Sequence, residues 1–157
     1  MAGTYRIVDE PAPGRLASLV VNPFWPLLAA MLAGFWLALP WFAVNSAAMG
    51  SATRRREWAW LAGGAALSAA LGGALVYGVD GGLLGARAFR YALVGLVAWR
   101  LAVAYVVFAL QQPSFELHQH FGGAARNGAM LVVAAALVAP AKLLGKEGAA
   151  LLALLVG

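Results

Sequence analysis

The stretch from Tyr91 to Leu110, YALVGLVAWRLAVAYVVFAL, is apolar apart from Arg100 near its middle. A helix of this length rises about 30 Å at about 1.5 Å per residue, which matches the hydrocarbon thickness of a bilayer. A charged guanidinium at that depth costs at least about 2.5 kcal/mol, so it needs hydrogen-bond acceptors, water or a lipid headgroup. The stretch therefore predicts a transmembrane helix whose charge another group must satisfy.

The composition of the whole chain supports a membrane protein. Of the 157 residues, 63% are hydrophobic and only 11% are charged, a balance that a soluble domain of this size could not shield from water. Arginine outnumbers lysine, and alanine and glycine are abundant, a bias typical of GC-rich genomes. We expect an all-α, polytopic integral membrane protein with a bundle of about four transmembrane helices, in a bacterial inner membrane.

The apolar runs divide the chain into a short leading segment and a membrane domain. Residues 1–21 are expected to form an N-terminal tail or interfacial lead-in, and residues 22–157 the membrane domain. The expected spans are residues 23–48, 58–78, 89–111 and 128–145, with a short interfacial helix at about 114–121 and an apolar C-terminal segment at 148–157.

Three points of this topology stay open. The first span is either one helix kinked at Pro40 or a re-entrant hairpin that turns near Gly34, whose arms are each too short to cross. The orientation of the bundle is open because positive charges lie on both sides of the expected membrane. Residues 148–157 either continue the fourth helix, lie at the interface or contact a partner.

Small residues recur every four positions along the second span. Gly64, Ser68 and Gly72 lie on one face of the expected helix, with further alanines and glycines beside them. A face without bulky side chains allows a second helix to approach closely. The pattern predicts a helix–helix contact there, either within the chain or with another subunit.

Three adjacent arginines, Arg54, Arg55 and Arg56, follow the first span. Such a cluster beside a short loop is typical of the cytoplasmic side of a membrane protein, and its alternative role is contact with phosphate headgroups. The net charge of +5 is divided among short loops. It therefore indicates membrane lipids as partners and gives no indication of nucleic acid.

Glu116, His118 and His120 alternate along one short segment. In an extended strand they would share a face and form a weak candidate for a metal site. In a helix, residues two apart diverge by about 200°, so they could not hold one ion. We expect no dedicated metal site, and the histidines are interfacial side chains or a contact for a pigment.

No catalytic set is recognisable in the expected spans. They contain no Asp or Glu, the chain has no cysteine, and no histidine shares the depth of Ser68. We therefore expect no enzyme and predict no cofactor other than lipids. The leading hypothesis is a non-catalytic integral membrane subunit, or an assembly factor, of a larger membrane protein complex.

Arg100 separates this hypothesis from its alternatives. No acid of this chain is expected at its depth, so its counter-charge is expected from another integral membrane subunit, a lipid or an anion. The alternative in which it is purely structural would bond it to Ser68, Asn45, Tyr105 or helix carbonyls. An oligomeric transporter or channel that selects an anion with Arg100 is the second hypothesis, and a lipid-binding or lipid-modifying protein is the third.

Overall fold

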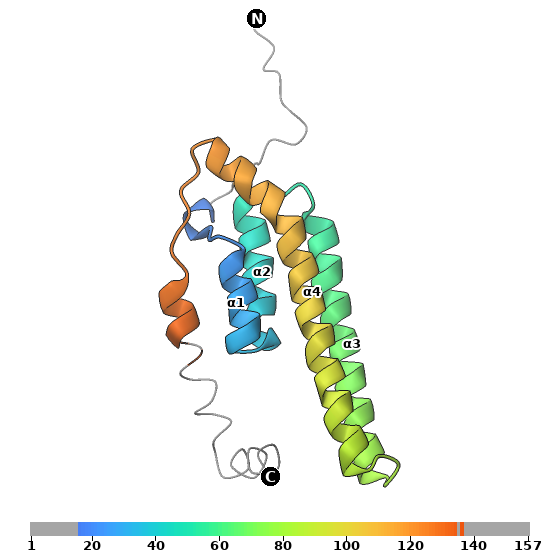
Figure 1. Ribbon diagram of the computed structural model, residues 1–157. Coiled ribbons are helices and arrows are strands. Elements are labelled where there is room, and N and C mark those ends of the chain that lie inside the picture. Colours follow the sequence, from blue (N-terminus) through green and yellow to red (C-terminus); the bar gives the residue numbers. More distant parts are fainter. Residues whose placement is uncertain (1–15, 135, 137–157) are drawn as a thin grey trace, which may run out of the picture.

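Two helical hairpins of unequal length lie side by side in the computed structural model (Figure 1). The structure describes residues 16–134 and 136, and within these residues it contains helices and no strand. The elements are η1 (Ala17–Leu19), α1 (Phe24–Leu32), α2 (Phe35–Met49), α3 (Arg54–Asp80) and α4 (Ala86–His120).

The short hairpin, α1 and α2, replaces the single helix expected over residues 23–48. The chain reverses at Gly34, whose φ of +99° lies in a region that favours glycine. At about 1.5 Å per residue the two helices are roughly 14 and 22 Å long, so neither is long enough to cross a bilayer by itself. The prediction of one continuous span is wrong, and its alternative, a hairpin that turns at Gly34, is the observed structure.

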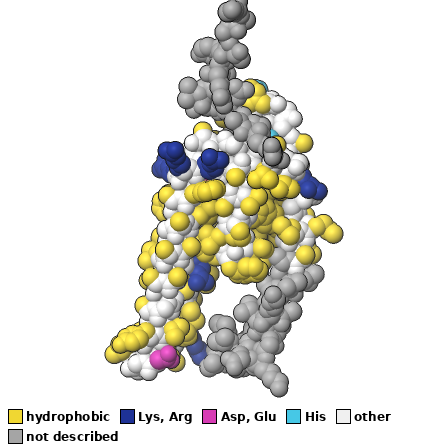
Figure 2. Space-filling view, turned by 180° about the vertical axis from the view of Figure 1, so that it is seen from behind, with side chains coloured by type: hydrophobic (Ala, Val, Ile, Leu, Met, Phe, Trp, Pro, Cys, Tyr) yellow, Lys and Arg dark blue, Asp and Glu magenta, His cyan; other side chains and the backbone are white. Residues whose placement is uncertain are grey.

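The long hairpin consists of α3 and α4, which contain the expected spans 58–78 and 89–111. Both helices are long and apolar enough to cross a membrane. Only 17% and 22% of their most apolar windows are buried, so they do not resemble the enclosed core helices of a soluble protein. Figure 2 shows the hydrophobic side chains that this leaves on the surface. The described residues thus contain two such helices rather than four.

The expected interfacial helix at 114–121 is also corrected, because α4 continues without a break to His120. Pro113 removes one backbone hydrogen bond from the helix, which nevertheless continues beyond it. Ser114 and Phe115 are buried directly after the proline, which holds this last part of the helix against the rest of the fold. Figure 1 shows α4 bending over the short hairpin here.

Part of the C-terminal prediction lies outside the described residues. Of the expected fourth span, 128–145, residues 129–134 and 136 are helical. The remainder of that span, the apolar segment 148–157 and most of the expected tail 1–21 are not described. The segment after α4 returns to the start of the short hairpin, where Arg126 N–H donates to the carbonyl of Val20 at 2.7 Å.

The apolar core lies where the two hairpins meet. One side comes from the short hairpin and the other from facing positions of α3 and α4, and its buried members are Ala30, Phe35, Ala38, Phe42, Leu61, Val103, Ala104 and Val107. At Gly64 the two long helices come so close that a Cβ atom would lie 2.5 Å from Cγ1 of Val103. Gly72, two turns further along α3, has no atom within 4 Å of the same position.

This difference predicts opposite effects for two equivalent substitutions. Gly64→Ala should lower the free energy of unfolding by about 1–3 kcal/mol because the new methyl group overlaps Val103. Gly72→Ala should be neutral or stabilising, since alanine favours helix by about 1 kcal/mol over glycine. Unfolding in mild detergent, followed by circular dichroism, measures both changes. Adding Val103→Ala should recover part of the loss at Gly64, and equal effects at the two glycines would contradict the contact.

Candidate functional site

Arg100 lies beside the turn of the short hairpin. It borders a cavity of about 110 Å³ together with Gly34 and Phe35, where the chain reverses. The remaining lining is apolar and consists of Ala30, Met31, Val97 and Leu101. The Nε atom of Arg100 is buried and makes no hydrogen bond within the described part of the chain. Arg100, the charged residue expected near the middle of a bilayer, thus borders a mostly apolar cavity at the hairpin turn.

The partners expected within the chain for a purely structural Arg100 do not accept a hydrogen bond from its Nε–H. Asn45 donates from Nδ2 to Gln111 at 3.1 Å, on another part of α4. The Oγ atom of Ser68 is itself buried without a hydrogen-bond partner among the described residues. Tyr105 is 62% exposed. Among residues 16–134 and 136, the Arg100 Nε–H therefore has no acceptor.

The arginines Arg54, Arg55 and Arg56 form the first turn of α3 rather than a loop. Their side chains are exposed, and the guanidinium of Arg54 lies 5.9 Å from the centre of the Trp58 ring. A guanidinium over an indole face is a favourable cation–π arrangement. The cluster is placed so that it can meet headgroups or solvent at one end of the long hairpin.

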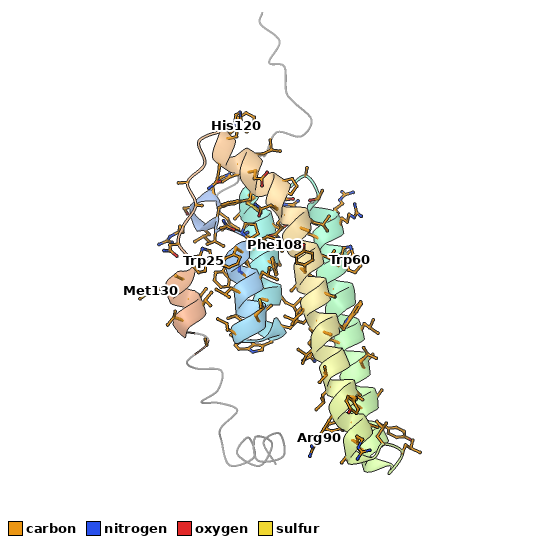
Figure 3. All side chains as sticks on the ribbon, in the orientation of Figure 1. Trp25, Trp60, Arg90, Phe108, His120 and Met130 are labelled. Carbon is orange, nitrogen blue, oxygen red and sulfur yellow. The ribbon has the colours of Figure 1, made fainter. Side chains whose placement is uncertain are left out.

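The helical path of α4 separates the three residues of the weak metal candidate. Glu116 is exposed and accepts a hydrogen bond from Gln112 at 3.0 Å. His118 is buried, whereas His120 is exposed at the end of α4 opposite to Arg90 (Figure 3). In the described residues, no group of three or more His, Asp or Glu side chains is positioned to hold a metal ion.

Among the described residues, the most deeply buried acidic side chain lies directly before the expected second span, 58–78. Glu57 has no exposed surface, although it directly follows the three exposed arginines. Its Oε1 atom accepts hydrogen bonds from the hydroxyl groups of Ser51 and of Thr53, the latter at 2.6 Å. Ser114 lies 3.0 Å from Ser51 and, because the single Ser51 proton goes to Glu57, Ser114 is the donor.

Gln111 of α4 completes this cluster and connects it to the short hairpin. Its Nε2 group donates to Glu57 Oε2 at 2.9 Å and to the carbonyl oxygen of Phe42 at 2.8 Å. Its Oε1 atom accepts from Asn45, whose Oδ1 atom accepts from the Val21 N–H at 2.9 Å. We call Asn45, Ser51, Thr53, Glu57, Gln111 and Ser114 the polar clamp, because they connect α2, the loop after it, α3 and α4.

A signal for the clamp is present in the sequence. Glu57 precedes Leu61, Gly64 and Ser68 at spacings of four, three and four residues, which place all four on one helix face. Gln111 occupies the same kind of position on α4, four residues after Val107. The face of small residues, extended by one turn toward the arginines, therefore indicates that Glu57 points into the bundle.

The comparisons with known proteins identify no family. Neither the protein-family models, nor the curated proteins, nor the solved structures compared with this chain match it. The geometry of the described residues is therefore the basis for the functional proposal.

The clamp predicts that two adjacent glutamines differ in their importance. Gln111→Leu removes a donor to Glu57, a donor to Phe42 and an acceptor for Asn45, and each buried group left unsatisfied costs about 1–3 kcal/mol. The variant should unfold many degrees below the wild-type protein in mild detergent. Gln112→Leu is the matched control, since Gln112 bonds only to the exposed Glu116 in the described structure. Similar melting temperatures for the two variants would contradict a stabilising role of the clamp.

Proposed function

We propose that this protein is a non-catalytic integral membrane subunit, or an assembly factor, of a larger membrane complex. In this proposal α3 and α4 cross the bilayer, and the short hairpin enters it from one side without crossing. The supporting observation is the position of Arg100, which borders an apolar cavity and whose Nε–H has no hydrogen-bond partner in the described chain. A carboxylate of a neighbouring subunit is the group that would satisfy this charge best in an apolar environment.

The surroundings of Arg100 support a contact with another protein chain. Met31 and Val97, which line its cavity, are 63% and 54% exposed, and Trp36 beside the hairpin turn is 66% exposed. A second transmembrane helix packed there would cover these side chains and bring its own acidic residue to Arg100. The buried polar residues of the clamp, in contrast, are used in hydrogen bonds to one another, which supports a structural role rather than catalysis.

The hairpin also simplifies the proposed orientation. Both ends of the hairpin lie on one side of the proposed membrane, so Arg54, Arg55 and Arg56 lie on that side. Arg126 lies there too, because its backbone N–H donates to the carbonyl of Val20 at the start of the hairpin. Arg87 and Arg90 lie at the other end of α4. Among the residues that the structure describes, four cations against two favour the cytoplasm for the side that carries the three adjacent arginines.

Anion selection remains the second candidate function, and one observation favours it. The positive end of the α2 dipole, at Phe35, borders the same cavity as the Arg100 guanidinium. Two positive groups at one niche attract an anion, as the ends of broken helices do in transporters. The otherwise apolar lining, without further polar groups along a path, makes this candidate the weaker one.

Substitution of Arg100 separates the two candidates. Arg100→Leu should lower co-purification of the partner more than about 100-fold, since an unpaired buried carboxylate on the partner costs about 3–5 kcal/mol. The isolated chain should still insert, because a desolvation cost is removed. Arg90→Leu, an exposed arginine of the same helix, is the control. Wild-type partner stoichiometry with a loss of anion flux in liposomes would support the channel and overturn the subunit proposal.

The re-entrant hairpin has its own test in the native sequence, which has no cysteine. Ser18→Cys and Ala52→Cys flank the hairpin at exposed positions and should react with a membrane-impermeant maleimide from the same side of sealed vesicles. Gly82→Cys, between α3 and α4, should react only from the other side. Labelling of Ser18→Cys and Ala52→Cys from opposite sides would instead indicate that residues 23–48 cross the bilayer.

A further inference from the structure

A groove of about 410 Å³ lies between η1, α2 and the segment that follows α4. Arg126 and Asn127 line it with polar side chains, and most of the remaining lining is apolar. The apolar residues include Leu37, Pro40, Val44 and Leu131. The groove shares none of its lining with the Arg100 cavity or with the clamp.

The returning segment is fixed firmly against the short hairpin. The Arg126 N–H donates to the carbonyl of Val20, and Gly128 packs closely against Trp25 and Trp41. A Cβ atom on Gly128 would lie 2.7 Å from Cγ of Trp25 and 3.0 Å from Cζ2 of Trp41. Figure 3 shows Trp25 on the part of α1 near this segment. These close contacts make the groove a built feature of the fold.

The groove is polar at one end and apolar along its length. Arg126 is exposed, and its backbone forms an isolated parallel β-bridge with Val21 at the open end of the hairpin. From Val44 to Leu37, α2 descends seven residues, or about 10 Å, toward the turn at Gly34. In the proposed membrane placement, the cation is at the interface and the apolar part extends toward the bilayer centre.

We propose that this groove binds one anionic phospholipid. The Arg126 guanidinium pairs with the phosphate, and the Asn127 amide nitrogen donates beside it, since Asn127 Oδ1 already accepts from the Ala129 N–H at 2.9 Å. One acyl chain lies along Leu37, Pro40 and Val44. Charge complementarity and the depth of the apolar part both match this ligand. The proposal goes beyond the subunit function, because it requires no protein partner.

The headgroup part of the proposal is tested by lipid retention. The full chain is reconstituted with equal amounts of phosphatidylglycerol and phosphatidylcholine that carry identical acyl chains, and the lipid retained in mild detergent is measured by native mass spectrometry. The wild-type protein should retain about one phosphatidylglycerol. Arg126→Gln should reduce the preference for phosphatidylglycerol by about tenfold. Arg87→Gln, an exposed arginine at the far end of α4, should leave the preference unchanged.

The acyl-chain part is tested by filling the groove. Val44→Trp should reduce retention of both lipids several-fold, whereas Val76→Trp, on the exposed surface of α3, should not. The proposal is overturned if Arg126→Gln keeps the wild-type preference. It is also overturned if glycerol phosphate displaces the lipid as effectively as phosphatidylglycerol does, because Arg126 would then be a general anion site without an acyl groove.

Discussion

The hydrogen bonds of Gln111 are the interactions on which the arrangement of the two hairpins depends. One amide side chain bonds to Glu57 on α3, to the Phe42 carbonyl on α2 and to Asn45 on α2, and all of these residues are buried. Apolar packing between helices is tolerant of rotation and translation, whereas these bonds require one register. The core between the hairpins contributes contact area, and the clamp determines which contacts form.

The helical class and the two long helices could be predicted from the sequence, because a run of about twenty apolar residues carries its own length criterion. The break at Gly34 could not be assigned in the same way. Residues 23–48 are apolar on both sides of that glycine, and the choice between a kinked helix and a hairpin depends on partners that are distant in sequence. Gln111 lies 66 residues from Asn45, and hydropathy contains no information about that pairing.

The candidate site shows a similar division. Arg100 could be selected from the sequence because a charge in the middle of an apolar run is conspicuous, but its position beside the hairpin turn follows only from the tertiary fold. Glu57 was missed for the opposite reason. It follows three arginines, a pattern typical of a solvated segment. Only its position on the same helix face as Gly64 indicates that it points inward. Pro113 likewise predicts a helix end, yet α4 continues to His120, because Ser114 and Phe115 beyond the proline pack against the rest of the fold.

The clamp also determines an order of events during biosynthesis. Chains are synthesised from the N-terminus, so α1 and α2 leave the ribosome before Gln111 exists. Until α4 has been made, the Asn45 amide lacks its Gln111 acceptor, and Glu57 lacks the amide that bonds its second carboxyl oxygen. The short hairpin therefore reaches its final bonded state only after α4 has been synthesised. Within this part of the chain, the elements made first are completed last, because the short hairpin can form these bonds only when α4 docks onto it.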